Sequence, residues 1–151
     1  MDILVDIDGT LANAKHRLHF IKRGEGQTTP PDWDAFFDAC DQDKPITIVC
    51  TLVSSLQENH RVIFVTGRPE RIREKTLKWL GDHGCLVDMP PHMLMRKDGD
   101  HRPDWVVKEE MLGLMRAHGY KPKLVIEDRK QVVEMYRKRG LIVFQCAEGD
   151  Y

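Results

Sequence analysis

Short apolar runs alternate with longer amphipathic segments along most of the chain. The runs have the nearly continuous, β-branched character of buried strands, and they predict strands at residues 3–7, 61–66, 92–95, 123–128 and 141–146. Apolar residues recur at helical spacing in the segments between them, at residues 45–60, 68–84, 104–119 and 129–140. This alternation predicts an α/β fold, in which a parallel sheet is covered by helices on both faces as a Rossmann-like three-layer sandwich.

One long segment, at about residues 12–45, interrupts this alternation. It lies between the first strand and the first long helix, for which Pro45 is a suitable first-turn residue. An insertion of this length beside the end of a strand predicts a small helical cap over a functional site. Because 151 residues suffice for one well-packed core but not two, we expect a single domain spanning residues 1–151.

Composition narrows the possible partners and the compartment. The chain carries 23 basic and 24 acidic residues, so no overall positive field attracts nucleic acid or membrane. The four cysteines are widely spaced and form no C-x-x-C pair, which favours reduced thiols. No apolar run reaches the roughly 18 residues of a membrane span, and the first residues lack the pattern of a signal peptide. We therefore expect a soluble, cytoplasmic protein.

Polar side chains stand at the carboxyl ends of three predicted strands, the edge at which open parallel sheets bind ligands. The residues are Asp6 and Asp8 after the first strand, Thr66 and Arg68 after the second, and Glu127 and Asp128 at the end of the fourth. Carboxylates that converge in this way repel one another unless a cation lies between them, and an all-oxygen ligand set favours Mg²⁺. The sequence therefore predicts a magnesium site at this edge.

The same edge has the groups that phosphoryl transfer requires. Lys108, in the first turn of a predicted helix, together with Thr66 and Arg68 can stabilise the negative oxygens of a phosphoryl group. One aspartate can attack phosphorus while the second transfers a proton. Each motif alone also has a structural explanation, because D-x-D and Glu-Asp pairs are common helix caps and Thr-Gly is a common turn. Their joint occurrence favours the catalytic interpretation.

These motifs resemble those of the haloacid dehalogenase superfamily, in the same order. The match consists of "DIDGT" at residues 6–10, Thr66 after an apolar strand, a helical Lys108 and "ED" at 127–128. The resemblance implies that Asp6 is the nucleophile that forms an aspartyl-phosphate and that Asp8 is the general acid and base. It further implies that Thr66 and Lys108 hold the phosphoryl group. Mg²⁺ would be bound by Asp6, the backbone carbonyl of Asp8, and Asp128.

A more specific similarity, from Asp6 to Tyr151, is to the 3′-phosphatase domain of the phage polynucleotide kinase family. It is strongest in "VTGRPE", "RPDWVVKEEM" and the segment from "VIEDRKQVVEMY" to the end of the chain. By this resemblance Arg17 and Arg68 would contact substrate phosphate, and Asp104 would support the metal or Lys108. Two alternatives remain for these residues, because Asp104 could simply cap its helix and Arg17 could lie in solvent.

Two departures from that family concern its activities and its choice of substrate. The chain has no G-x-x-x-x-G-K-[ST] loop, so we expect no 5′-kinase activity. The 12–45 segment matches the family poorly, and caps set substrate choice in this superfamily. Four aromatic residues of the segment either stack on bases or form the core of the cap: Phe20, Trp33, Phe36 and Phe37.

The leading hypothesis is a Mg²⁺-dependent polynucleotide 3′-phosphatase that acts on DNA or RNA ends in nucleic-acid repair. The alternative is a phosphatase of mononucleotides or other small phosphate esters. A non-enzymatic phospho-acceptor domain is disfavoured because the D-x-D motif comes first and the paired acids last, and a binding module that has lost catalysis is disfavoured because every motif residue is present. A separate kinase or ligase partner is left open by the sequence.

Overall fold

A five-stranded parallel sheet forms the centre of the protein. The computed structural model describes residues 1–22, 29–87 and 90–149. The sheet has the order β5-β4-β1-β6-β7, and its strands are β1 (Asp2–Val5), β4 (Arg61–Pro69), β5 (His92–Arg96), β6 (Pro122–Arg129) and β7 (Ile142–Gly149). All five predicted strands are therefore present.

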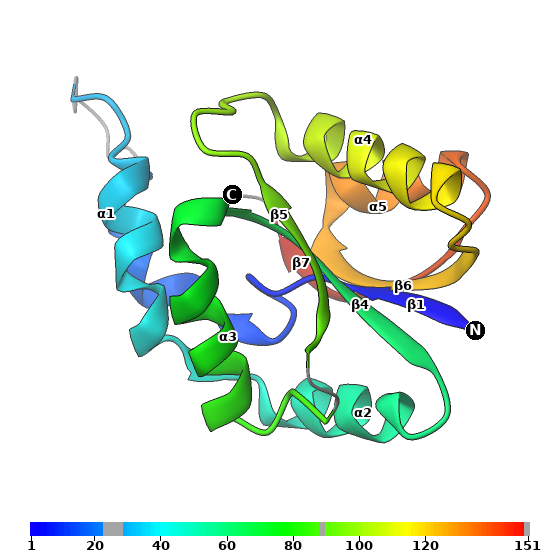
Figure 1. Ribbon diagram of the computed structural model, residues 1–151. Coiled ribbons are helices and arrows are strands. Elements are labelled where there is room, and N and C mark those ends of the chain that lie inside the picture. The colour runs from blue at the N-terminus through cyan, green and yellow to red at the C-terminus, as the bar shows by residue number, and fades with distance from the viewer. Residues whose placement is uncertain (23–28, 88–89, 150–151) are drawn as a thin grey trace.

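Helices cover both faces of this sheet, so the predicted α/β class is confirmed (Figure 1). One face packs against α2 (Thr47–Gln57) and α3 (Arg73–Asp82), which follows the 3₁₀ turn η3 (Glu70–Ile72). The other packs against α4 (Asp104–Ala117) and α5 (Lys130–Lys138). Successive β1 side chains alternate between the two cores, since Ile3 and Val5 face the first and Leu4 the second.

The 12–45 segment begins and ends in a small sheet of its own. Its first residues, β2 (Ala12–Asn13), pair antiparallel with its last, β3 (Lys44–Pro45). Between them lie η1 (Ala14–Phe20), α1 (Trp33–Asp38) and η2 (Ala39–Gln42), whereas residues 23–28 fall outside the described part of the chain. The expectation that Pro45 begins a helix is wrong, because Pro45 is paired with Ala12 in β3 and the helix begins at Thr47.

A tight turn carries the chain from β1 into this segment. Gly9 has a φ of 90°, a backbone conformation that residues other than glycine rarely adopt. Its N–H donates to the carbonyl of Ala12 at 2.8 Å, while the N–H groups of Leu11 and Ala12 both donate to the carbonyl of Ile7. The turn therefore leaves Asp6 and Asp8 at the carboxyl edge of the sheet while the chain departs toward β2.

Within the described residues, no helix is both long enough and apolar enough to cross a membrane.

Candidate active site

Strand pairing brings three acidic residues together at the carboxyl end of β1. Val5 is in register with Ile126, and the N–H of Asp6 donates to the carbonyl of Ile126 at 3.0 Å. Asp6 therefore lies beside Glu127 and Asp128, and one carboxylate oxygen from each of the three lies within 4.8 Å of the others. All three side chains are buried.

Burial and mutual repulsion keep these carboxyl groups from ionising easily. Both effects raise the pKa of Asp6 well above its ordinary value. Burial, with the neighbouring charges of Asp128 and Asp104, raises the pKa of Glu127 to about 7. Burial, with the charge of Asp6, raises the pKa of Asp128 to about 6. A divalent cation would remove the repulsion, and three oxygen ligands with room for water fit Mg²⁺.

Lys108 is the buried cation that this cluster surrounds. It lies in the second turn of α4, and its ammonium group is 2.6 Å from Asp6, 2.8 Å from Glu127 and 3.2 Å from Asp104. Burial opposes its charge, but these carboxylates outweigh that effect and raise the pKa of Lys108 well above its ordinary value. The ammonium therefore stays charged beside Asp6.

Asp104 supports this lysine, as one of the two alternatives predicted. It is the first residue of α4 rather than its N-cap, and no side-chain capping hydrogen bond is formed there. Its carboxylate instead binds Lys108, one turn later, and the guanidinium groups of Arg96 and Arg129. A Cβ on Gly67 would lie 2.4 Å from its Oδ1, so a larger residue where β4 passes would displace this carboxylate.

Asp8 lies in the opposite electrostatic environment. Its Oδ1 accepts hydrogen bonds from Arg17 Nη2 at 2.6 Å and from Arg68 Nη2 at 2.6 Å. Although burial opposes ionisation, the charges of Arg68 and Arg17 lower the pKa of Asp8 to about 2. Both arginine side chains are fully buried, which excludes a solvated surface position for Arg17.

Asp43 completes this second cluster, and sequence reasoning missed it. Its buried carboxylate accepts from Arg17 Nε at 2.8 Å, Arg17 Nη2 at 2.7 Å and Arg68 Nη2 at 3.0 Å, and it contacts His16 Nε2 at 2.7 Å. Its backbone carbonyl accepts from Trp79 Nε1 at 2.8 Å. Two aspartates thus bind two arginines, and Asp43 connects the 12–45 segment to β4 and α3. No motif marked it, because its partners are distant in sequence.

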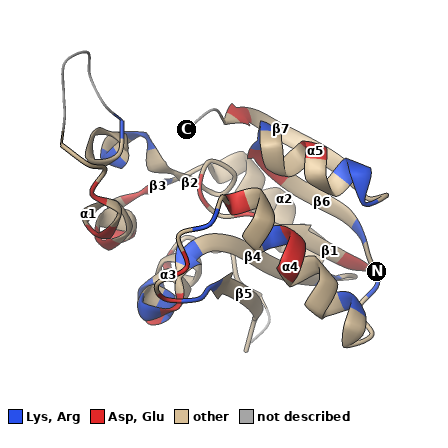
Figure 2. Ribbon diagram, turned by 90° about the horizontal axis from the view of Figure 1, so that it is seen from above, with Lys and Arg blue, Asp and Glu red and all other residues tan. Residues whose placement is uncertain are grey.

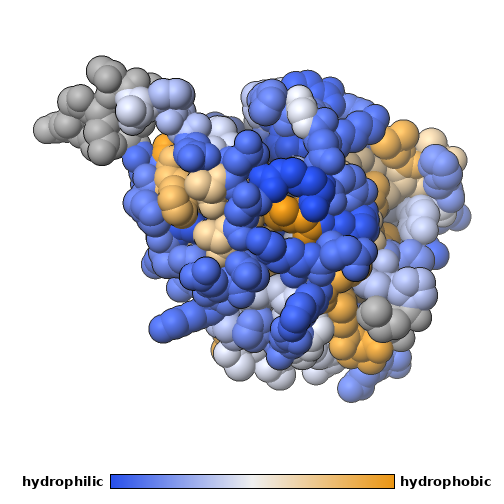
Figure 3. All heavy atoms as spheres, turned by 60° about the vertical axis from the view of Figure 1, so that its left-hand side comes forward, coloured by the Kyte–Doolittle hydropathy of each residue, from blue (hydrophilic) through white to orange (hydrophobic). Residues whose placement is uncertain are grey.

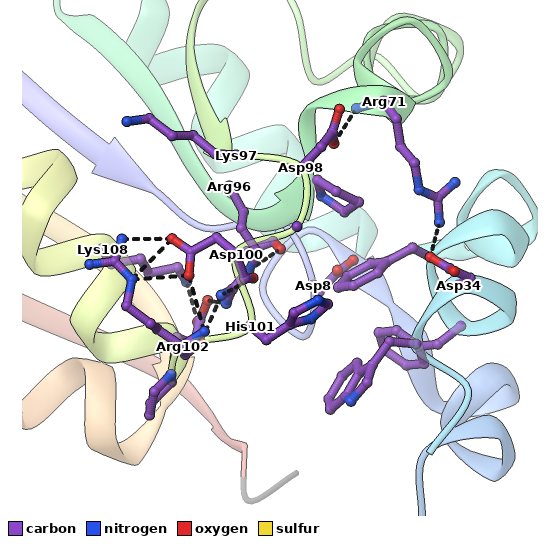
Figure 4. A pocket seen from close by; sticks show the side chains of 18 of the residues that line it. Asp8, Asp34, Arg71, Arg96, Lys97, Asp98, Asp100, His101, Arg102 and Lys108 are labelled. Carbon is purple, nitrogen blue, oxygen red and sulfur yellow. Dashed lines mark hydrogen bonds and ion pairs between the residues drawn. The ribbon is translucent and has the colours of Figure 1, made fainter. Parts of the chain in front are cut away.

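A cavity of about 400 Å³ opens over these clusters (Figure 4). Of the predicted site residues, Asp6, Asp8, Asp104 and Lys108 are among the described residues that line it. Asp128 lies beside Asp6, and Arg17 and Arg68 contact Asp8, but these three are not among the described residues that line the cavity. Thr66 is also buried, and its Oγ1 accepts from the N–H of Arg68 at 3.2 Å. Contacts of Thr66, Arg17 and Arg68 with a substrate stay predictions.

Solved structures first define the type of fold. A haloacid dehalogenase-like hydrolase from Streptococcus pneumoniae is similar with a TM-score of 0.63 and 14% identity, over 95% of this chain and 83% of that chain. The class C acid phosphatase from Bacillus anthracis gives a TM-score of 0.69 and 15% identity, over 99% and 67% of the two chains. The fold is therefore that of haloacid dehalogenase-like hydrolases.

The family can be stated more narrowly. The family model described as the polynucleotide kinase PNKP phosphatase domain matches residues 1–151, and the chain belongs to this family. A chain in the structure of the Pnkp1/Rnl/Hen1 RNA repair complex has a TM-score of 0.77 and 27% identity, over 99% of this chain and 43% of that one. The present chain thus spans less than half the length of that relative. The present chain is a phosphatase domain of haloacid dehalogenase type.

Replacing Asp43 should destabilise the protein strongly. Asp43→Asn removes one of the two carboxylates that neutralise Arg17 and Arg68, and an uncompensated buried charge typically costs about 3–5 kcal/mol. Urea unfolding should show this loss in the free energy of unfolding. Asp41→Asn, at an exposed position of the preceding turn η2, is the matched control and should change it little. Equal stability of the two variants would contradict the account.

Proposed function

We propose that this domain is a Mg²⁺-dependent phosphomonoesterase that forms an aspartyl-phosphate, and that its substrate is the 3′-phosphorylated end of DNA or RNA. The observation that carries this proposal is the position of Asp6. Its carboxylate faces the cavity, contacts the buried ammonium of Lys108 and lies within 4.8 Å of two further carboxylates. Such a group is a nucleophile with charge compensation already in place.

The reaction has two displacements at phosphorus. In the first, an Asp6 oxygen forms a bond to phosphorus, the bond to the substrate 3′-oxygen breaks, and Asp8 gives its proton to that oxygen. In the second, Asp8 takes a proton from water and the water oxygen attacks phosphorus. The bond between phosphorus and the Asp6 oxygen breaks, which frees the Asp6 carboxylate and releases inorganic phosphate. We assign Lys108 and Thr66 to the transferring phosphoryl oxygens, and Arg17 and Arg68 to the phosphate of the bound substrate.

The donor set fits a metal ion at the acidic cluster. Asp6, Asp128 and the backbone carbonyl of Asp8 would hold Mg²⁺, with Glu127 close enough to contribute or to orient the set. When bound, Mg²⁺ supplies positive charge that keeps the carboxylates ionised and reduces their repulsion of the phosphate. Glu127 Oε1 accepts from the N–H groups of Asp128 and Arg129, both at 3.1 Å, which fixes the backbone that carries Asp128.

Asp8 must become protonated before it can act as an acid, and its arginine partners provide the means. While both arginines bind Asp8, its pKa is about 2 and it is a carboxylate. A substrate phosphate that competes for Arg17 and Arg68 would withdraw their charge from Asp8 and raise that pKa. Asp8 would then gain a proton only when substrate is present.

We treat residues 1–151 as a single domain. Its 12–45 segment acts as the cap that selects the substrate. It supplies Arg17 to the Asp8 cluster, and α1 supplies Trp33, Asp34, Phe36 and Phe37 to the wall of the cavity. The similar chains in the Pnkp1/Rnl/Hen1 complex support a role in RNA or DNA repair. Any kinase or ligase activity would then belong to other polypeptides or domains. We place the domain in the cytoplasm.

Small phosphate esters are the second candidate substrates. Lys or Arg and Asp or Glu are interspersed along the chain, and the described residues show no extended basic stripe along the ribbon (Figure 2). A polynucleotide therefore gains little from long-range attraction, and a mononucleotide would bind the same cavity equally well on charge alone.

A substrate panel separates these candidates. Phosphate release should be fastest from an oligonucleotide with a 3′-phosphate, compared with a 5′-phosphorylated oligonucleotide and free nucleotides, each with Mg²⁺ or EDTA. Asp6→Asn should lower the rate by about a thousand-fold or more while the protein stays folded. Equal rates on all three substrates would contradict 3′-end specificity, and an active Asp6→Asn variant would contradict the nucleophile assignment.

Metal removal should change how stability depends on pH. The folded-state pKa values of Glu127 and Asp128, about 7 and about 6, exceed their ordinary values of 4.5 and 3.8, so the folded protein binds extra protons in this interval. In EDTA the free energy of unfolding should therefore rise as pH falls from about 8 to about 5. Urea unfolding in Mg²⁺ should show higher stability at pH 8 and a smaller rise.

Asp128→Asn should reduce both the rise in EDTA and the stabilisation by Mg²⁺, because it removes one of the mutually repelling carboxylates. Identical pH dependence in EDTA and in Mg²⁺ would show that no metal binds this cluster.

A pair of glycine substitutions tests the position of Asp128. A Cβ on Gly149 would lie 2.1 Å from Asp128 Oδ2, so Gly149→Ala should displace the carboxylate and raise the Mg²⁺ concentration for half-maximal activity about 10- to 100-fold. Gly113→Ala in α4 is the control, since no atom lies within 4 Å of its added Cβ. It should stabilise the helix by about 0.5–1 kcal/mol without altering the Mg²⁺ requirement. An unchanged requirement in Gly149→Ala would contradict the assignment.

A further inference from the structure

One wall of the cavity is an aromatic face on α1. Trp33 lines the cavity with 42% of its surface exposed, and its ring stacks on Phe37 with 6.0 Å between centroids and 28° between planes. Phe36 is only 2% exposed and meets both rings edge-on. The structure thus separates the two roles left open for these aromatics, because Phe36 forms the core of the segment whereas Trp33 is available to a ligand.

The opposite wall is the segment 97–103, which connects β5 to α4. His101 of this segment points into the cavity, toward the side on which Asp8 and Asp34 lie, whereas Lys97 points away (Figure 4). Arg96 holds the segment in place, because its Nη1 donates to the carbonyls of Asp100 at 3.1 Å and Arg102 at 2.7 Å. The imidazole of His101 therefore faces the cavity from a well-supported backbone.

Arg71 connects the two walls. Its guanidinium binds Asp34 at 2.8 Å and also Asp38, both on α1, while its backbone N–H donates to Asp98 at 2.9 Å. The aromatic face and the 97–103 segment are thus both fixed to the same residue in η3. The space between them is a preformed slot, and a preformed slot loses little entropy when a flat group enters.

Charge does not explain what this slot would recognise. Among the described residues that line the cavity, six are acidic and six are basic, namely Asp6, Asp8, Asp34, Asp98, Asp100 and Asp104 against Arg71, Arg96, Lys97, Arg102, Lys108 and Arg129. The lining has no net charge from these residues, and Asp34 and Asp100 are already paired with Arg71 and Arg102. The face of the molecule shown in Figure 3 is mainly hydrophilic with apolar patches. The exposed ring of Trp33 offers stacking, an interaction that does not depend on net charge.

We propose that Trp33, which lines the same cavity as His101, binds the nucleobase of the nucleotide whose 3′-phosphate is attacked by Asp6. This inference rests on the proposed function and names the part of the substrate that the cap recognises. A volume of about 400 Å³ exceeds the need of a phosphate group and falls in the range of about 300–1000 Å³ that holds small organic ligands. Base stacking on an aromatic side chain contributes about 1–3 kcal/mol and tolerates any base.

The test compares two oligonucleotides that carry a 3′-phosphate and differ only in whether the terminal nucleotide has a base or is abasic. The wild-type protein should have a higher kcat/KM on the substrate with the base. Trp33→Ala should reduce that preference about 5- to 150-fold, which corresponds to the loss of one stacked base, and should do so mainly through KM. Trp33→Phe should retain most of the preference, because a flat ring remains.

Trp105→Ala is the matched control, because Trp105 on α4 is 38% exposed and is not among the described residues that line the cavity. It should leave the preference unchanged. A nucleoside 3′-monophosphate is tested as a further substrate. If Trp33→Ala loses as much kcat/KM on it as on the oligonucleotide, the slot recognises one nucleotide, whether free or at a chain end. Quenching of tryptophan fluorescence by this ligand in Asp6→Asn, and its loss in Asp6→Asn with Trp33→Phe, measures binding without turnover.

Two results overturn the inference while the proposed function stands. One is a wild-type protein that releases phosphate equally well whether the 3′-terminal nucleotide carries a base or is abasic. The other is a Trp33→Ala variant whose preference for the base is unaltered. A wild-type protein that hydrolyses small esters but no 3′-phosphorylated end contradicts the proposed function itself. Thermal unfolding of each variant identifies a misfolded protein, and in that case Trp33→Phe and the fluorescence measurement decide.

Discussion

The arrangement of the site depends on one buried ion cluster, in which the ammonium of Lys108 lies among Asp6, Asp104 and Glu127. Burial of a charged lysine is costly unless carboxylates surround it, and three do so here within 3.2 Å. Their residues come from the end of β1, the first turn of α4 and the end of β6. The cluster therefore ties β1 and β6 to the first two turns of α4, which packs on one face of the sheet, and it leaves Asp6 at the cavity.

A second cluster, made of Asp8, Arg17, Arg68 and Asp43, gives the neighbouring aspartate the opposite environment. The pKa of Asp6 is raised by burial among acids, and the pKa of Asp8 is lowered by two arginines. These directions are the reverse of what the proposed roles require, since a nucleophile must be ionised and an acid protonated. A cation at the acidic cluster and a substrate phosphate at the arginines would each correct one of them. The two pKa shifts therefore describe the protein without metal and substrate.

Much of this site could be predicted because it follows from local patterns. Apolar strands locate Asp6, Asp8, Glu127 and Asp128, and the geometry of parallel sheets then places them at one edge. The i,i+4 spacing of Asp104 and Lys108 similarly implies contact on one helix face. Asp43 and the depth of Arg17 could not be predicted, because both depend on how the 12–45 segment folds back onto β4. That segment lacks a regular period, and even its last residue, Pro45, proved to be in a strand rather than a helix.

The central claim is that Asp6 becomes covalently phosphorylated. The most direct measurement uses Asp8→Asn, which should allow attack by Asp6 but slow the release of phosphate. After incubation with Mg²⁺ and a 3′-phosphorylated oligonucleotide and an acid quench, mass spectrometry should find one added phosphoryl group on the peptide that contains Asp6. The Asp6→Asn variant should show none. A wild-type protein that turns over this substrate, while no phosphorylated Asp6 peptide is found in Asp8→Asn or in the wild type, would contradict the account.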